Sequence, residues 1–130
     1  MDIKKYTETD YPALLKLLTE QGEDWKEYWG ASREKYEKAL SFSTVYLLCE
    51  DNGELSGYIR CRDDDGFGVY IYDLLVKPSC RGAGLGRLLM EKVCEDNPDS
   101  TVYVMSDVDP YYNKLGYKKA GSIFIVTPLN

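Results

Sequence analysis

A glycine-rich turn between an apolar strand and an amphipathic helix carries the clearest chemistry in this chain. Glycines stand at positions 82, 84 and 86, directly after Arg81. Glycine lets backbone N–H groups approach an anion without a Cβ in the way, and a helix that begins here adds a partial positive charge. The guanidinium of Arg81 supplies a permanent cation whose forked donors suit phosphate oxygens. These residues predict a diphosphate-binding site.

The spacing of the glycines excludes two common nucleotide-binding motifs. A P-loop ends in Gly-Lys-Ser or Gly-Lys-Thr, whereas Gly86 is followed by Arg87 and Leu88. The Rossmann fingerprint has the spacing Gly-X-Gly-X-X-Gly at the start of a βαβ unit, whereas the glycines here have the spacing Gly-X-Gly-X-Gly and no such unit begins with them early in the chain. The pattern that fits is Arg-X-X-Gly-X-Gly, formed by Arg81, Gly84 and Gly86. It follows a strand that ends Val-Lys-Pro, and it resembles the acetyl-coenzyme A signature of the GNAT family of N-acetyltransferases.

A second segment, Tyr111-Tyr112-Asn113-Lys114-Leu115-Gly116-Tyr117, is similar to another motif of the same family. The resemblance implies that Tyr112 lies on a short helix with its hydroxyl near the thioester sulfur, as the candidate general acid. A phenol with an ordinary pKa of about 10 can return a proton to a thiolate with a cysteine-like pKa of about 8.5. The two motifs have the family's order, and the resemblance extends over nearly the whole chain.

The resemblance also implies how acetyl-CoA, the expected co-substrate, is held. The pantetheine arm would bond to the backbone of Leu74 and Val76, and the thioester carbonyl would meet a backbone N–H near Leu74 in an oxyanion-hole arrangement. The predicted cofactor-binding residues are Leu74, Val76, Arg81, Gly82, Ala83, Gly84, Gly86 and Arg87. No metal is expected, because the chain has no histidine and no Cys-X-X-Cys pair.

The general base is the position at which this chain departs from the family pattern. Many members have a carboxylate where this chain has Tyr72, and the next residue, Asp73, stands in an apolar strand. An isolated carboxylate there is costly, so Asp73 is either a candidate base or a structural hydrogen-bond acceptor. Strand alternation places it opposite Tyr72 unless a bulge intervenes. An ordered-water relay to a more distant carboxylate, such as Asp107, is the third possibility.

An aromatic and acidic stretch between residues 20 and 40 is the candidate acceptor pocket. Its aromatic rings, among several carboxylates, suit an ammonium group through cation–π contacts and ion pairing. The predicted substrate-binding residues are Trp25, Tyr28, Trp29 and, on the central strand, Tyr72. The alternative is that Trp25, Tyr28, Trp29 and Tyr36 form an ordinary stripe that faces the core.

Length, charge and cysteine content limit the class of protein. The chain has 130 residues, enough for one domain, and 16 basic against 22 acidic residues give a net charge of −6. Without a basic run, nucleic acid is not an expected partner, and without an 18-residue apolar run or a leader neither is a membrane. The four cysteines occupy ordinary core and turn positions, as in a reduced protein. We therefore expect a cytoplasmic location.

The hydrophobic pattern predicts a single α/β (α+β) domain over residues 1–130, with a mixed, mostly antiparallel central sheet flanked by helices. The expected order is β-αα-βββ-α-β-α-β, the order of the GNAT family. Residues 84–95 should form the helix after the glycine turn, with Leu85, Leu88, Leu89 and Val93 facing the sheet. Residues 117–127 should form the last strand.

Three hypotheses for function follow. The first is an acyltransferase that acetylates the primary amine of a small molecule, by direct transfer in a ternary complex. The second is a catalytically silent acyl-CoA-binding sensor or interaction module, which the absence of a carboxylate at position 72 permits. The third is a protein N-terminal or lysine acetyltransferase. A homodimer through the late strands is plausible by resemblance to the family.

Overall fold

A mixed five-stranded sheet organises residues 1–129, the part of the chain that the computed structural model describes. The strands lie in the order of the sequence, and they are antiparallel except for β5, which runs parallel to β4. Their bounds are β1 Asp2–Lys5, β2 Thr44–Cys49, β3 Leu55–Asp63, β4 Val69–Val76 and β5 Val102–Val104. The predicted mixed, mostly antiparallel sheet is confirmed.

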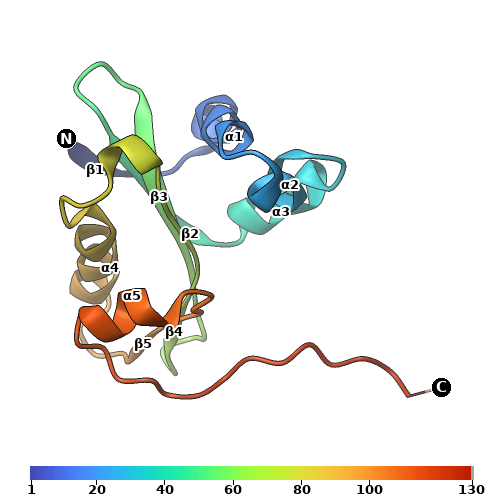
Figure 1. The fold of residues 1–130 in the computed structure, drawn as a ribbon, viewed down its shortest axis with the longest axis vertical. Helices are drawn as coiled ribbons and strands as arrows, with labels where there is room; N and C mark the ends of the chain where they lie inside the picture. Colours follow the sequence, from blue (N-terminus) through green and yellow to red (C-terminus); the bar gives the residue numbers. More distant parts are fainter. Residues whose placement is uncertain (130) are drawn as a thin grey trace.

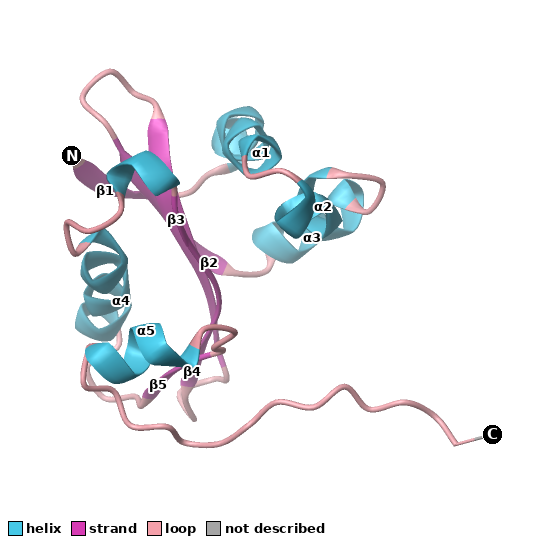
Figure 2. Ribbon diagram, in the orientation of Figure 1, coloured by secondary structure: helices cyan, strands magenta, loops and turns pink. Residues whose placement is uncertain are grey.

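Helices cover both faces of this sheet (Figures 1 and 2). Three lie on one face, and two lie on the other. The first three are α1 Tyr11–Glu20, α2 Lys26–Trp29 and α3 Arg33–Ser41, and the other two are α4 Leu85–Asp96 and α5 Asp109–Lys114. Three short 3-10 helices span Glu8–Asp10, Glu23–Trp25 and Pro78–Cys80. None of the helices within residues 1–129 is long and apolar enough to cross a membrane.

Two hydrophobic clusters hold the layers together. The α1–α3 core consists of the buried Leu14, Leu17, Leu18, Tyr36, Leu40, Val45, Leu47, Leu55, Tyr58 and Leu75. The α4 core consists of the buried Tyr46, Leu48, Ile59, Cys61, Val69, Ile71, Leu89, Met90 and Val93. The predicted stripe of α4 is wrong at one position: Leu88 is 44% exposed, and Met90 is buried in its place. The periodicity of the helix allowed either residue, and the way α4 packs on the sheet selected Met90.

A β-bulge in β4 changes which face its side chains occupy. Arg60 of β3 pairs with Asp73, but the next residue, Cys61, pairs with Ile71, so Tyr72 has no partner on β3. Ile71 therefore packs in the α4 core, while Leu75 packs in the α1–α3 core. Without the bulge, residues 71, 73 and 75 would share one face.

β5 pairs with only the first part of β4. Val69–Ile71 pair with Val102–Val104, and the N–H of Met105 donates to the carbonyl of Ile71 at 2.9 Å. Beyond Ile71, the described structure shows no pairing between the two strands. The second half of β4, residues 72–76, thus has an open edge on the side of β5, at the end that leads into the glycine turn.

The expected last strand is not formed. Residues 117–129 contain no helix or strand, and Figure 1 shows the chain leaving the body after α5. The β-branched and aromatic residues that predicted a strand are present, but a strand needs backbone hydrogen bonds with a partner edge, and residues 117–129 pair with no strand of the described sheet. Among the described residues, all four cysteines are free thiols.

Candidate active site

The open edge of β4 presents backbone hydrogen-bonding groups. The N–H of Lys77 donates to the carbonyl of Ser56 at 2.8 Å, which places the backbone groups of Lys77 on the side of β3. Successive residues of a strand point their backbone N–H and C=O groups to alternating sides. The groups of Leu74 and Val76 therefore point away from β3, toward the open edge. The side chain of Arg81 already uses one of them: its Nε donates to the Val76 carbonyl at 2.8 Å. These are the two residues whose backbone the sequence assigned to the pantetheine arm.

The glycine turn begins where this edge ends. The 3-10 helix Pro78–Cys80 is followed by Gly82 and Gly84, with φ angles of +89° and +74°, and Gly84 caps the N-terminus of α4. Only glycine adopts such angles without strain, which explains why both positions need it. A Cβ built on either residue would meet no atom within 4 Å, so the backbone here is open to a ligand. Arg81 and Ala83 are exposed beside it.

Gly86 is in the same motif but has a different local role. It lies in the first turn of α4, and a Cβ there would come within 2.5 Å of the Tyr111 hydroxyl and 3.8 Å of Leu74 Cδ2. The glycine thus allows α5 to approach α4 and β4 closely. The two motifs identified in the sequence meet in space at this contact. Arg87 points away from it, toward Glu91, with which it forms an exposed ion pair at 2.9 Å.

Tyr112 lies on α5 and packs against the α4 core, as does Leu74. Burial, followed by the neighbouring charge of Asp107, raises the pKa of its phenol to about 12. Tyr112 therefore keeps its proton throughout the neutral range and can donate a hydrogen bond. Asp107 itself is exposed in the β5–α5 connection.

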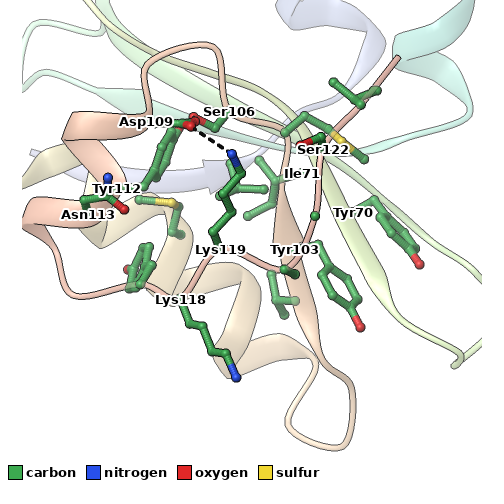
Figure 3. A pocket seen from close by; sticks show the side chains of 18 of the residues that line it. Tyr70, Ile71, Tyr103, Ser106, Asp109, Tyr112, Asn113, Lys118, Lys119 and Ser122 are labelled. Atoms are coloured by element: carbon green, nitrogen blue, oxygen red, sulfur yellow. Dashed lines mark hydrogen bonds and ion pairs between the residues drawn. The ribbon is translucent and has the colours of Figure 1, made fainter. Parts of the chain in front are cut away.

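A cavity of about 630 Å³ opens beside β5 and includes Tyr112 in its wall (Figure 3). Asp109, Tyr112 and Asn113 contribute from α5, and Tyr70 and Tyr103 contribute from the paired ends of β4 and β5. The start of the C-terminal segment completes the lining, where Lys119 Nζ lies 3.4 Å from Asp109 Oδ2. None of the other predicted site residues lines this cavity, so Tyr112 is the only one of them that it contains.

Asp73 lies on the opposite face of the sheet, inside a polar network within the α1–α3 core. It is 6% exposed, and three donors surround its carboxylate. Oδ2 accepts from Arg60 Nε at 2.5 Å and from the Tyr36 hydroxyl at 2.6 Å, and Oδ1 accepts from the Tyr28 hydroxyl at 3.2 Å. The Tyr36 and Tyr58 hydroxyls are 2.7 Å apart. Of the two roles left open for Asp73, this arrangement supports the structural acceptor.

The bulge brings Tyr72 to the same network. The ring of Tyr72 is 5.2 Å from the Arg60 guanidinium carbon, and Tyr72 remains 40% exposed. Tyr72 and Asp73 thus both contact Arg60, although they are adjacent in a strand. The sequence reasoning missed Arg60 and Tyr58. The type of partner could have been predicted, because a carboxylate inside an apolar strand requires a buried cationic or hydroxyl partner on a neighbouring element.

Between positions 20 and 40, Trp25, Tyr28 and Trp29 are half-buried and pack against the α1–α3 core, which includes the buried Tyr36. Trp25 and Tyr28 have ring centroids 5.0 Å apart, and Tyr28 and Tyr36 have centroids 4.6 Å apart. The Trp29 indole N–H donates to the Gly22 carbonyl at 2.9 Å. Burial, followed by the charge of Asp73, raises the pKa of Tyr28 to about 12. These contacts explain a core-facing stripe, while Trp25, Tyr28 and Trp29 remain partly exposed.

Within residues 1–129, no group of three or more acidic, cysteine or histidine side chains is placed to hold a metal ion. The site is therefore described by backbone groups, one arginine, one tyrosine and the polar network around Asp73.

Comparison with known proteins shows which family the chain resembles. The model of the acetyltransferase (GNAT) family matches residues 11–117, which include both motifs. An acetyltransferase of the GNAT family from Streptococcus pneumoniae TIGR4 has a TM-score of 0.72 and 26% identity, covering 98% of both chains.

Two curated relatives match over a shorter range. An uncharacterised N-acetyltransferase from Pyropia yezoensis is 30% identical over 94 residues, which are 65% of this chain and 54% of the relative. The chloroplastic serotonin N-acetyltransferase 2 of Oryza sativa subsp. japonica is 31% identical over 93 residues, 65% of this chain and 46% of the relative. The chain spans about half the length of these curated relatives. On the strength of the family match over residues 11–117, the chain belongs to the acetyltransferase (GNAT) family.

Proposed function

We propose that this chain transfers an acetyl group from acetyl-CoA to the primary amine of a small molecule, by direct transfer in a ternary complex. The observation that carries the proposal is the open edge of β4, which lies between the glycine turn and the helix that holds Tyr112. Acetyl-CoA is the acetyl donor that the family uses, and it supplies an activated thioester.

The chain's own groups fit the parts of that donor. The backbone of Leu74 and Val76 would bond to the pantetheine arm as a neighbouring strand does. The exposed Arg81 and the N–H groups of Gly82–Gly84, at the N-terminus of α4, would hold the diphosphate. β5 ends at Val104, opposite Ile71, so no described strand pairs with this part of β4 and its edge is open to the arm.

The reaction forms one C–N bond and breaks one C–S bond. The amine must lose a proton, and the departing thiolate must gain one. Tyr112 would donate a hydrogen bond from its hydroxyl to the developing thiolate, and the thiolate would take its proton from solvent water as CoA is released. Asp73 already accepts three hydrogen bonds, so we assign removal of the amine proton to a water relay that leads to Asp107 rather than to Asp73 directly.

A small aromatic amine is the acceptor class that we favour. Trp25, Tyr28, Trp29 and Tyr72 are partly exposed aromatic side chains on the α1–α3 side, and their ring faces attract an ammonium group. The net charge of −6 also favours a cationic substrate. The rice relative is a serotonin N-acetyltransferase, and serotonin belongs to the same chemical class.

A panel of acceptors tests this proposal. Free thiol release from acetyl-CoA would be followed with arylalkylamines, alkyl diamines, amino acids, and peptides with free N-termini or lysines. We expect turnover with the arylalkylamines and little with the peptides. Turnover with peptides alone would replace this proposal with a protein acetyltransferase, and acetyl-CoA binding without turnover across the panel would favour a silent binding module.

Arg81→Gln should weaken acetyl-CoA binding by about tenfold to a hundredfold. A hydrogen bond to a charged group contributes about 1.5–3 kcal/mol, and the neutral amide replaces a cation next to the diphosphate. Isothermal titration with CoA measures the affinity. Arg62→Gln is the matched control, because Arg62 is an exposed arginine at the other end of β3, opposite Tyr70. An unchanged affinity in Arg81→Gln, or an equal loss in both variants, would contradict the assignment.

A further inference from the structure

Arg60 of β3 has its guanidinium tied to two different elements. Its Nε donates to Asp73 Oδ2 on β4 at 2.5 Å, and its Nη1 donates to the Ser43 hydroxyl at 3.2 Å. The Ser43 hydroxyl in turn donates to the carbonyl of Ala39 in α3 at 2.7 Å. A planar, forked guanidinium can make two such bonds at once, whereas a lysine ammonium is a point charge on a flexible stem. The two ties therefore fix the plane of the Arg60 guanidinium.

A run of side-chain contacts connects this guanidinium to the aromatic residues of the candidate acceptor pocket. The guanidinium carbon of Arg60 lies 5.3 Å from the centroid of the buried Tyr36 ring. The Tyr36 and Tyr28 centroids are 4.6 Å apart, and those of Tyr28 and Trp25 are 5.0 Å apart. The same guanidinium carbon lies 5.2 Å from the centroid of Tyr72. Arg60 thus links Tyr72 on β4 to the half-buried rings on the other side of the network.

Tyr72 is exposed but has a fixed partner. It is 40% exposed, and because of the β-bulge it has no pairing residue on β3. Within residues 1–129 its hydroxyl has no hydrogen-bond partner, so the cation–π contact with Arg60 is the polar interaction of this side chain. A guanidinium over a tyrosine ring is attracted by the negative charge of the ring face. The fixed guanidinium therefore orients the Tyr72 ring.

The guanidinium also changes what the ring of Tyr72 can bind. A tyrosine ring that already has a cation over it attracts a second cation less strongly, because the first one uses the same negative charge. A neutral aromatic ring can still stack on it. Tyr72 is thus suited to the ring of an aromatic amine, and Trp25, Tyr28 and Trp29 are left for the ammonium group.

We propose that Arg60 is a positioning residue for the acceptor, because it holds the ring of Tyr72 in place to stack on the aromatic ring of an arylalkylamine. This inference rests on the proposed acetyl transfer. It adds the pair of residues that selects an aromatic acceptor over an aliphatic one of the same size. Arg60 acts through Tyr72 and is not itself a ligand of the acceptor.

Two acceptors with the same ammonium group test the role of Tyr72. Phenylethylamine and cyclohexylethylamine are nearly equal in size, but only the first has an aromatic ring. Thiol release from acetyl-CoA gives KM and kcat for each. In the wild-type chain we expect KM to be about threefold to tenfold lower for the aromatic amine, the range that a stacked aromatic pair gives. Tyr72→Leu should raise the KM of the aromatic amine until the two values agree within about twofold, with kcat nearly unchanged. Tyr72→Phe should keep the wild-type ratio of the two KM values.

Three further variants test the role of Arg60. Arg60→Lys keeps a charge beside Asp73 but not the fork, and it should lower the KM ratio as Tyr72→Leu does. In the double variant Tyr72→Leu/Arg60→Lys, the KM of the aromatic amine should equal that of Tyr72→Leu alone. Ser43→Ala removes one tie of Arg60 without touching the buried ion pair, and it should lower the ratio in the same direction. Arg62→Lys is the matched control, because Arg62 is an exposed arginine on the same strand, and its ratio should stay at the wild-type value.

A KM ratio that stays at the wild-type value in both Arg60→Lys and Ser43→Ala overturns the proposal, and so does an equal fall in Arg62→Lys. A double variant whose KM for the aromatic amine rises well beyond that of Tyr72→Leu also overturns it, since Arg60 would then act independently of Tyr72. Equal KM values for the two amines in the wild-type chain overturn the proposal and leave the acetyl transfer intact. Absence of thiol release with either amine overturns the proposal, and absence with every acceptor of the panel overturns the proposed function as well.

Discussion

Tyr112→Phe should lower kcat by about a hundredfold or more and leave acetyl-CoA affinity within about threefold of wild type. Removing one preorganised hydrogen-bond donor to a developing negative charge costs about 10²–10³-fold in kcat, and the variant removes one hydroxyl while it keeps the ring that packs against the α4 core. Steady-state kinetics with the best acceptor of the panel, together with calorimetric titration of CoA, separates the two quantities. Tyr103→Phe is the matched control, because Tyr103 also lines the cavity but lies on β5 at the paired end of the sheet. A kcat close to wild type in Tyr112→Phe would remove Tyr112 from the mechanism.

The raised pKa of Tyr112 fixes the pH dependence of this effect. With a pKa of about 12, caused first by burial, the phenol keeps its proton well above pH 9. Deprotonation of Tyr112 should therefore cause no loss of kcat between pH 7 and pH 10. Proton transfer from such a phenol to a free thiolate of pKa about 8.5 is unfavourable, so the hydroxyl must act chiefly as a hydrogen-bond donor while the C–S bond breaks. The same burial raises the pKa of a thiol that forms there, which narrows the difference between its pKa and that of the phenol. A fall of kcat near pH 8 that disappears in Tyr112→Phe would contradict the assigned pKa.

Asp73→Asn should destabilise the fold by about 3 kcal/mol or more. Removing one partner of a buried ion pair costs about 3–5 kcal/mol, because the other charge stays buried and uncompensated. Here the charge left behind is Arg60, whose side chain is 13% exposed, and the carboxylate that it loses also holds Tyr28 of α2 and Tyr36 of α3. Urea unfolding followed by the fluorescence of Trp25 and Trp29 measures the loss. Since whole domains are stable by about 5–15 kcal/mol, a loss of this size is readily measured.

A double-mutant cycle with Arg60→Gln gives the energy of the pair itself. The double variant should be less destabilised than the sum of the two single variants, because neither charge is then left alone. Glu91→Gln is the control, since the Arg87–Glu91 pair is exposed on both sides and should contribute no more than about 0.5 kcal/mol. Additive effects of Asp73→Asn and Arg60→Gln would show that the two side chains do not act as a pair. A folded Asp73→Asn variant of near wild-type stability that has lost turnover would restore Asp73 as the catalytic base.

Local sequence patterns determined the parts of this protein that depend on a few neighbouring residues. The glycines at 82 and 84 adopt positive φ angles in the turn where the sequence required flexible backbone, and Gly84 caps α4. The helix after the glycine turn also follows from the spacing of its apolar residues. These features have in common that steric limits on φ and ψ, or the period of the apolar residues, act within one turn or one strand.

Long-range register decided what the sequence left open. Whether Asp73 shares a face with Tyr72 depends on a bulge, and the bulge exists only in the pairing of β4 with β3, so no local pattern in residues 69–76 reveals it. The partners of Asp73 come from three separate elements, so no local pattern reveals them either. The open edge of β4 likewise depends on where its pairing with β5 stops.

The C-terminal segment shows most clearly what a local sequence pattern leaves undetermined. Residues 117–127 have the composition of a strand, and the sequence by itself determined that preference. Whether a strand forms is decided by the presence of an edge within reach, because a strand is stabilised by hydrogen bonds and side-chain contacts with its neighbour rather than by its own residues. In the single chain, residues 124–129 do not contact the outer edge of β5. Whether they reach that edge depends on the direction in which the chain leaves α5, and only the tertiary structure decides that direction.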